Sequence, residues 1–470
     1  MGTTTDHLLG RNLRYFVKKE TVTGGKYGAS DQEALAGTNA AKVTASSIDF
    51  QVARNDRMDS RTTRSALEKI TGKQEVTWSC DSFILPKGGT TVPDVDPLIE
   101  AAMGTGLGAG TPVQSTITGI TLNNPLLVTC SGGHNLKTND RIRITEVVGT
   151  TQVNNLTFTV TVTGSTTFTC NGIDGTSGHS SYGSAGKTTL LTYRPSDVNA
   201  LPTLRIARTG NDVLREDLFG AYVEEMTVSA SGGDVPKMTF SGGAFNYALT
   251  GTGTTEGAGS SATALITESG NGVSFMVGSV ISFNSLNDKV VQSKSSDTLT
   301  IASSSWSDGQ AVTPTTYTES TGGNPLNGMT GSLTLNSVEI PITSFEMTLA
   351  NGLKAVSDEA FEKGTSDFIA GFRAVTGTIG FRARKDLIKN LTQRYVQATA
   401  TADPSFTTIP IVVKLGTESG DIMVIHLPTV ELNFAGIEIP ESEEAILSVP
   451  FTALGSSGAD ELLISINQTS

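Results

Sequence analysis

The sequence predicts a mainly β protein, and two observations support that prediction. The 470 residues include 51 glycines, and serine and threonine are frequent. Short runs in which apolar and polar residues alternate recur along the chain, with turn residues between them. This composition favours short strands and turns over long helices, and the length is enough for about three domains.

The first predicted elements lie between residues 46 and 104. Apolar and polar residues alternate from 46 to 55 and again from 74 to 85, which predicts two strands, the second with Trp78 on its buried face. A helix is expected over Asp96–Gly104. Asp96 is expected to cap it, and Gly104 is expected to end it.

A strand over residues 201–210 is followed by the hairpin YVEEMTVSASGGDVPKMTFSG, Tyr222–Gly242. This hairpin contains no catalytic, metal-binding or phosphate-binding motif. Strand periodicity places one set of side chains on a core and a second set on the opposite face. The core set is Met226, Val228, Met238 and Phe240, and the opposite set is Glu225, Thr227, Lys237 and Thr239.

The last third of the chain repeats this order of elements. It has predicted strands at 343–352, 372–384 and 409–420, a helix at 385–395 and a hairpin at 428–453. A charged, helix-prone loop covers 354–367, and Phe240 of the first hairpin aligns with Phe451 of the second. A shared order of strand, strand, helix, strand and hairpin predicts an internal duplication.

The repeat defines the predicted domains. They are an N-terminal arm (1–45, with a short strand expected at 13–18), a first copy (46–105 plus 201–250), an inserted small β-module (106–200), a Gly/Ser/Thr-rich linker carrying a small β-module (251–330) and a second copy (331–470).

Charge is concentrated at the C-terminal end. Residues 403–470 hold ten acids and one base, which is −9 of the net −13. An acidic protein of this kind repels DNA phosphates. The beginning of the sequence lacks the apolar segment of a signal peptide, and no apolar run is long enough to span a membrane. The cysteines Cys80, Cys130 and Cys170 are expected to be free thiols in a reducing cytoplasm.

No candidate catalytic residue, cofactor site or metal site emerges from the motifs. His134 and His179 share the inserted module with two cysteines, but the close paired spacing of a zinc site is missing. Glu224 and Glu225 are adjacent in a strand and point to opposite faces. The sequence therefore predicts a protein that is not an enzyme. One charged loop is either solvated or an interface, and its arginines are Arg54, Arg57, Arg61 and Arg64.

Two resemblances to known families follow from these segments. GGHNLKTNDRIRITEVVGTTQVNNLTFTVTVTGSTTFTCNGID resembles a small β-module named after a half-domain of ubiquitin-activating enzymes, which decorates phage virion proteins. LFGAYVEEMTVSASGGDVPKMTFSGGAF and LPTVELNFAGIEIPESEEAILSVPFTAL resemble the major tail tube proteins of long-tailed, non-contractile phages. The tube resemblance covers roughly 46–104, 201–250 and 335–468.

The resemblance implies two homologous tail-tube-type β-sandwich or barrel domains, each with one α-helix, plus small inserted β-barrel modules. It implies self-assembly into stacked rings that conduct DNA, in the virion tail, after assembly in the host cytoplasm. The usual ring is a hexamer, so a duplicated chain is expected to form a trimer with pseudo-sixfold symmetry. The expected partners are further copies of the chain, the tape measure, tail tip and tail terminator proteins, and DNA that passes without specific binding. No membrane partner is expected.

The same resemblance suggests site residues. Acids expected to line the lumen are Glu418, Asp421, Glu431, Glu438, Glu441, Glu443 and Glu444, and the four arginines above are candidates for contacts between subunits. The inserted module is expected outside the tube, and the N-terminal arm and charged loops are expected to bind neighbouring rings.

Two other classes remain open. An adhesin or glycan-binding virion protein would need an aromatic patch on the inserted module, for which the candidates are Phe158, Phe168, Tyr182 and Tyr193. A polysaccharide hydrolase would need a carboxylate pair in a cleft, and the sequence shows none that is evident.

Overall fold

The structure is a computed structural model that describes most of the chain. The described residues are 13–20, 34–56, 68–107, 113–196, 201–210, 213–284, 286–318, 322–326, 331–335, 338–356, 364–365, 367–382, 408–433, 446–456 and 458–469. Over these ranges, no helix is both long and apolar enough to cross a membrane.

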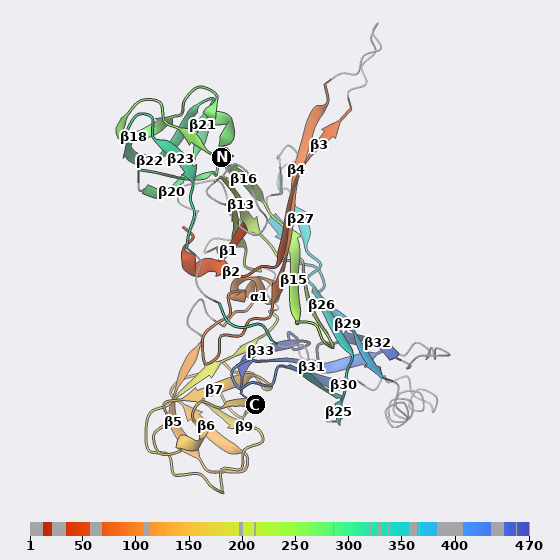
Figure 1. Cartoon of the computed structure of the whole chain (residues 1–470). Coiled ribbons are helices and arrows are strands. Elements are labelled where there is room, and N and C mark those ends of the chain that lie inside the picture. The colour runs from red at the N-terminus through yellow and green to blue at the C-terminus, as the bar shows by residue number, and fades with distance from the viewer. Residues whose placement is uncertain are drawn as a thin grey trace.

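A large antiparallel sheet runs through the middle of the molecule (Figure 1). We call its eight central strands the inner sheet. The first half of the chain contributes, in spatial order, β3 (Ala45–Asn55), β4 (Ile70–Phe83), β15 (Lys237–Gly243) and β14 (Glu225–Ser231). The second half contributes β26 (Ser344–Ala350), β29 (Ala374–Arg382), β32 (Ile446–Ala453) and β31 (Ile422–Leu432).

Each half also has an outer set of strands. In the first half the order is β2 (Ala40–Ala41), β1 (Leu13–Lys19), β12 (Leu204–Gly210), β13 (Leu214–Ala221) and β16 (Asn246–Thr250). In the second it is β25 (Val338–Ile340), β24 (Gly331–Leu335), β30 (Ile409–Leu415), β31 and β33 (Leu463–Gln468). Strand order therefore repeats in both layers, which supports the duplication hypothesis.

Equivalent backbone hydrogen bonds show which residues correspond. Thr44 N–H donates to the Asp81 carbonyl at 2.7 Å, and Thr343 N–H donates to the Gly380 carbonyl at 2.8 Å, each just before the first inner strand. Following the strand pairing from these points brings Ser79 to Thr378 and Ser241 to Pro450. The sequence-based alignment of Phe240 with Phe451 is therefore wrong by two residues, because alternating strands look alike after a shift of two.

The N-terminal segment is not only an arm. Residues 13–19 form β1, which pairs along its whole length with β12 and lies inside the outer layer of the first half. Phe16 and Val17 are buried there. The domain boundary expected at residue 45 thus separates a strand from the sheet to which it belongs.

Helix α1 (Asp96–Met103) ends as the sequence predicts, at Gly104 with a left-handed φ of 82°. Its start differs from the prediction, because Val95 is the cap residue and no side chain caps the helix. The Asp96 carboxylate instead accepts a 2.6 Å hydrogen bond from the buried Tyr193 hydroxyl. The helix expected at 385–395 lies outside the described residues.

The connections between the first two inner strands differ between the halves. In the first half, β3 and β4 continue as a hairpin beyond the body of the sheet (Figure 1). In the second half, the ends of the connection pair with each other as β27 (Lys354–Val356) and β28 (Asp367–Ile369), where the sequence suggested a helix-prone loop.

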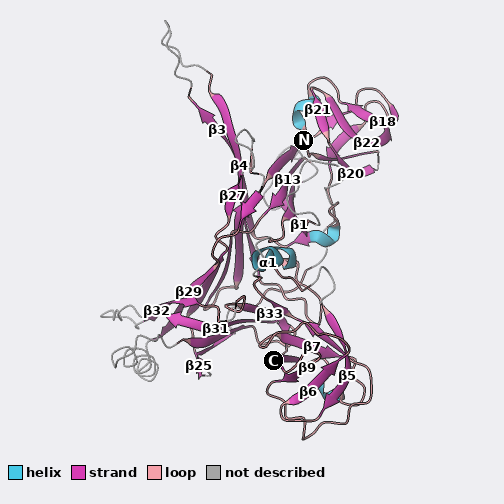
Figure 2. Ribbon diagram, turned by 180° about the vertical axis from the view of Figure 1, so that it is seen from behind, coloured by secondary structure: helices cyan, strands magenta, loops and turns pink. Residues whose placement is uncertain are grey.

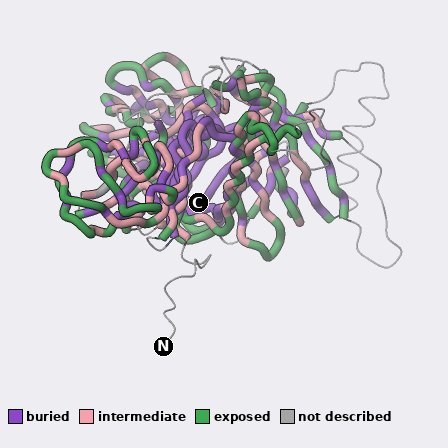
Figure 3. Tube along the Cα trace, turned by 90° about the horizontal axis from the view of Figure 1, so that it is seen from above, coloured by how far each residue is buried: buried purple, intermediate pink, exposed green. Residues whose placement is uncertain are grey.

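One hydrophobic core joins the two halves. It includes Trp78 and Phe240 from the first half and Met347 and Phe451 from the second, all at most 2% exposed. Seen from above, buried residues concentrate in the strands at the middle of the molecule (Figure 3). The α1 side chains Leu98, Ile99 and Met103 belong to the same core.

The inserted segment 106–200 contains a closed six-stranded barrel, as the sequence predicts. Its strands are β5 (Gln114–Thr121), β6 (Leu126–Cys130), β7 (Arg141–Thr145), β8 (Thr157–Val162), β9 (Thr167–Cys170) and β10 (Lys187–Leu190). We call it the first barrel. After it, β11 (Thr192–Tyr193) pairs with β33 of the second half.

Residues 253–314 form a second module with its own core. Its strands are β17 (Gly253–Thr254), β18 (Gly259–Ile266), β19 (Val280–Phe283), β20 (Leu286–Val290), β21 (Ser293–Ser295), β22 (Thr298–Trp306) and β23 (Ala311–Pro314). The Gly/Ser/Thr-rich start, expected to be a flexible linker, is therefore partly strand. Short 3-10 helices occupy Gly37–Asn39, Thr151–Val153 and Asn271–Ser274.

The first barrel and the second module lie on the same side of the central sheet, the side that carries α1 (Figures 1 and 2). A buried ionic cluster holds the second module in place. Arg215 and Asp217 form two hydrogen bonds of 2.7 Å, and both side chains are fully buried. Arg215 also donates to the Thr315 carbonyl at 2.9 Å, immediately after β23.

We expect Arg215→Met to lower the free energy of unfolding by about 3–5 kcal/mol, because the buried Asp217 carboxylate loses both of its 2.7 Å bonds and keeps only the longer 3.4 Å contact with Arg205. A suitable control is Lys187→Met, since the Lys187–Glu146 ion pair is exposed and such pairs contribute about 1 kcal/mol or less. Urea unfolding of both variants measures the difference. Equal losses would contradict the assigned role of Arg215.

Burial raises the pKa of Asp96 from 3.8 to about 6, against the lowering effect of the Tyr193 hydrogen bond. The folded state therefore binds the proton more tightly than the unfolded state. The stability that this proton contributes is present below pH 3.8 and is lost as the pH rises through about 6.

Asp96→Asn keeps an acceptor for Tyr193 and removes the titration. We expect the variant to gain stability relative to the unmodified protein between pH 4 and pH 7, by about 3 kcal/mol at most. Unfolding by urea at both pH values tests this. A stability difference that does not change with pH would show that Asp96 titrates normally.

Candidate functional site: the open face and free edges of the central sheet

The inner sheet has one face on the core and one open face. On the open face a row of side chains crosses seven adjacent strands at matching positions in the pairing register. We call it the threonine row: Asp81, Thr239, Thr227, Thr348, Thr376, Thr452 and Glu431. It is five threonines between two carboxylates.

Side chains in the row and beside it bond to one another. The Thr227 and Thr348 hydroxyl oxygens are 2.9 Å apart, across the junction of the two halves. Thr239 donates to Asp81 Oδ1 at 2.9 Å. In the next row along the strands, the hydroxyls of Ser47 and Ser79 are 2.7 Å apart. Thr227, Thr239 and Thr348, like Ser47 and Ser79, therefore already have partners within the sheet.

Acids outnumber bases on the described part of this face. The acids are Asp49, Glu75, Asp81, Glu225, Glu346 and Glu431, and the bases are Arg54, Lys73, Lys237 and Arg382. Six acids against four bases leave a net charge of −2. A face with this balance is a poor surface for holding DNA phosphates.

The structure separates the acids that the sequence grouped together. Glu431 lies on the open face opposite Thr452. Glu418 and Asp421 lie in the β30–β31 turn, at the end of the outer layer, where Asp421 N–H donates to the Glu418 carbonyl at 2.9 Å. Glu438, Glu441, Glu443 and Glu444 lie outside the described residues. So do Arg57, Arg61 and Arg64, whereas Arg54 is paired with Thr71 in the β3–β4 hairpin.

Sequence reasoning placed Glu225, Thr227, Lys237 and Thr239 on the face away from the core, and their burial pattern confirms it. It missed Asp49, Glu75, Asp81 and Glu346. Asp81 and Glu346 lie between buried residues of their strands, and Asp49 and Glu75 lie between residues that are less exposed than they are, so strand alternation was the available signal.

The two halves meet through backbone pairing of β14 with β26, from Glu225–Ala350 to Ser231–Ser344. The counterpart of β26 in the first half is β3, which has β4 on one side and no described strand on the other. At the opposite end of the sheet, β31 beyond Val430 pairs with β32 and, within the described residues, with nothing on its other side. Within the described residues the sheet therefore ends in two free edges. One is β3, which corresponds to β26, and the other is residues 431–433, of which Asn433 corresponds to the first residue of β14, Glu225.

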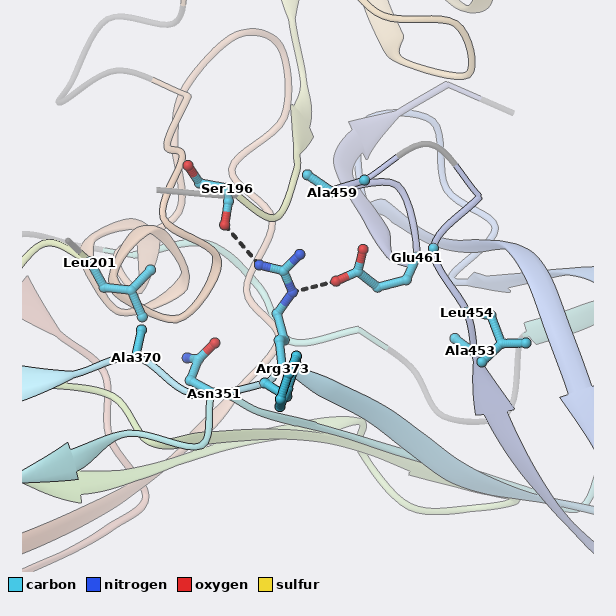
Figure 4. A pocket seen from close by; sticks show the side chains of 13 residues that line it. Ser196, Leu201, Asn351, Ala370, Arg373, Ala453, Leu454, Ala459 and Glu461 are labelled. Atoms are coloured by element: carbon cyan, nitrogen blue, oxygen red, sulfur yellow. Dashed lines mark hydrogen bonds and ion pairs between the residues drawn. The ribbon is translucent and has the colours of Figure 1, made fainter. Parts of the chain in front are cut away.

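A pocket of about 410 Å³ lies where the halves meet, and its polar groups are used for structure (Figure 4). Arg373 forms an ion pair with Glu461 and donates to the Ser196 carbonyl at 2.8 Å. Asn351 donates to the carbonyls of Ala102 and Val223 at 3.0 and 3.1 Å. Glu461 is the one carboxylate among the residues that line this pocket, so the pocket holds no acid–base pair.

The residues proposed for the other functions occupy structural positions. Among the aromatic candidates for a binding patch, Phe158, Phe168 and Tyr193 are buried, and Tyr182 is partly buried. This arrangement gives the first barrel no aromatic platform built from these residues.

The histidine and cysteine candidates for a zinc site are likewise engaged or buried. His134 bonds through both ring nitrogens, Nε2 to the Gly164 carbonyl at 2.9 Å and Nδ1 from Leu136 N–H at 3.0 Å. Cys130 and Cys170 lie in the barrel core, and burial raises the pKa of Cys170 to about 12. A thiol with this pKa is not a ready metal ligand.

Comparison with known proteins finds one family. Residues 123–191 match the ubiquitin-activating enzyme E1 FCCH domain, so this stretch of the first barrel is similar to that domain. The match covers a small part of the chain. No curated protein matches the chain.

Proposed function

We propose that the protein is the major tail tube subunit of a phage, a structural virion protein whose copies close into stacked rings and form a conduit for DNA. The observation that carries the proposal is the β14–β26 junction together with the two free edges. A contact between two different surfaces closes into a ring when its rotation permits. Here the chain contains one such contact. Its described edges are β3, the counterpart of β26, and the end of β31 up to Asn433, the counterpart of the first residue of β14.

The internal junction gives the expected contact between chains. Glu225 of β14 pairs with Ala350 of β26. The strand correspondence places Asn433, whose N–H donates to the Pro450 carbonyl at 2.9 Å, at the position of Glu225. It places Gln51 of β3 at the position of Ala350. Asn433 of one chain should therefore lie beside Gln51 of the next.

The open face suits the inside of such a ring. It points away from the first barrel and the second module, which lie on the opposite side of the sheet. Its hydroxyl groups and net negative charge would let DNA pass with few lasting phosphate contacts. Three chains would complete a pseudo-sixfold ring, because each chain contributes two equivalent halves.

The remaining parts of the proposal follow from the same assembly. The rings would stack in the virion tail, would be assembled in the host cytoplasm, and would contact the tape measure, tail tip and tail terminator proteins at the ends. Negative-stain electron microscopy of the purified protein tests the proposal as a whole. Rings or tubes are expected, and a protein that stays monomeric at high concentration would overturn it.

The double variant Gln51→Cys, Asn433→Cys tests the contact between chains. Under oxidising conditions we expect covalent species of up to three chains on a non-reducing gel, because the paired positions bring the two Cβ atoms within disulfide range. The native cysteines are buried and should not interfere.

The matched control is Asp49→Cys with Asn433→Cys, which is two residues out of register and should cross-link much less. A ladder that reaches six chains would contradict the trimeric ring. Assembled protein without cross-links would contradict the β31–β3 contact.

Thr376→Lys tests the open face. We expect tubes to form and to bind double-stranded DNA, because each ring would gain a set of cations on its inner wall, and binding should weaken steeply with salt. Fluorescence anisotropy with a short labelled duplex measures this. Thr118→Lys, on an exposed strand of the first barrel, is the control and should not have this effect. Tight DNA binding by unmodified tubes at physiological salt would contradict a non-adhesive wall.

A further inference from the structure

We propose that residues 253–315 form a second barrel of the E1 FCCH type, and that the last outer strand of each half is a docking surface for one such barrel. This inference rests on hydrogen bonding and topology and is independent of the proposed function. It assigns a domain type to a segment that sequence reasoning treated as a linker with a small module.

The first argument for a second barrel of this type is the order in which its strands are hydrogen-bonded to one another. The first barrel closes in the order β5-β6-β9-β8-β7-β10 and back to β5. In the second module, β18 pairs with β22, β22 with β21, β20 with β19, β19 with β23 and β23 with β17. If β20 and β21 together take the place of β8, each pair matches one pair of the first barrel in the same chain order.

The circuit closes between β17 and β18. Thr255 and Thr267 form an antiparallel bridge there. Glu256 N–H donates to the Ile266 carbonyl at 2.8 Å, and Glu268 N–H donates to the Thr254 carbonyl at 2.9 Å. The two small sheets of this module are therefore joined, as β5 and β6 are joined in the first barrel.

A distinctive turn before β7 in the first barrel supplies the second argument. Asp140 N–H donates to the Lys137 carbonyl at 3.1 Å, and Lys137 N–H donates to Asp140 Oδ2 at 2.7 Å. Asn139 has a φ of 75°, and its backbone N–H donates to the Val160 carbonyl at 2.9 Å. Val160 N–H returns a 2.9 Å bond to the Asp140 carbonyl.

The second module has the same turn before β19. Ser279 N–H donates to the Met276 carbonyl at 3.0 Å, and Met276 N–H donates to Ser279 Oγ at 2.8 Å. Gly278 has a φ of 93° and donates to the Val291 carbonyl at 2.8 Å. Val291 N–H returns a 2.9 Å bond to the Ser279 carbonyl. All four hydrogen bonds and the positive φ match, although serine replaces aspartate and glycine replaces asparagine.

The third argument is how each barrel meets the body. In the first barrel, Arg141 N–H donates at 2.7 Å to the hydroxyl of Thr192 in β11, the strand that pairs with β33. That hydroxyl lies 2.8 Å from Ser465 Oγ of β33. In the second, Val280 N–H donates to the Thr250 hydroxyl of β16 at 3.2 Å. The strands β33 and β16 hold the same place in their outer layers.

Amide hydrogen exchange of the full-length protein tests both parts of the proposal, the closed second barrel and the docking of each barrel on the last outer strand of its half. Thr192→Val and Thr250→Val remove the acceptors of Arg141 and Val280 with little change in side-chain volume. We expect each variant to speed exchange in its own barrel, in peptides that cover Arg141 or Val280, by about tenfold or more, and to leave the other barrel unchanged. Thr118→Val, which alters an exposed hydroxyl, should change neither.

Two outcomes would overturn the inference. One is an unchanged Val280 amide in Thr250→Val while Thr192→Val loosens Arg141. The other is exchange of the Glu256 and Glu268 amides at the rate of unstructured peptide, which would show an open module. If Thr250→Val fails to fold, exchange at Glu256 and Glu268 in the unmodified protein still decides whether the second barrel is closed.

Discussion

The backbone pairing of β14 with β26 is the interaction on which the rest of the structure depends. It joins the last inner strand of one half to the first inner strand of the other, so that the two halves share a core and present one open face. Without this pairing, each half would expose two long strand edges, and such edges associate readily with other strands. The Thr227–Thr348 contact and the buried Asn351 reinforce the same junction from its two faces.

The sequence alone was sufficient to predict the strands in which apolar and polar residues alternate regularly. Met226, Val228 and Phe240 are buried as strand periodicity requires, and Gly104 ends α1 because a left-handed residue is needed there. Tertiary contacts decided the rest. Asp96 turns to Tyr193 instead of capping its helix, and β1 joins a distant partner, β12, that no local pattern indicates. The start of the second module reads as a linker because small barrels and linkers use the same residues.

In the candidate site, too, local sequence patterns predicted some features and tertiary contacts determined the others. The composition of the acidic C-terminal region was visible, but a charge count does not say which face of a sheet an acid occupies. Glu431 reached the open face, while Glu418 and Asp421 fell in a turn. The threonine row depends on the register between strands that lie far apart in the sequence, so its members looked unrelated until the pairing was known. Isolated acids such as Glu346 gave no local signal beyond their place in the strand alternation.

The fusion of two halves in one chain has a thermodynamic consequence for the proposed ring. Each association of separate molecules loses translational and rotational freedom, at a cost of about 4–15 kcal/mol. A junction inside one chain avoids that loss, because its strands are already held at a high effective concentration. The β14–β26 pairing would therefore remove every second association step from the closure of a ring. Assembly would begin at a lower protein concentration, and its rate would depend less steeply on that concentration.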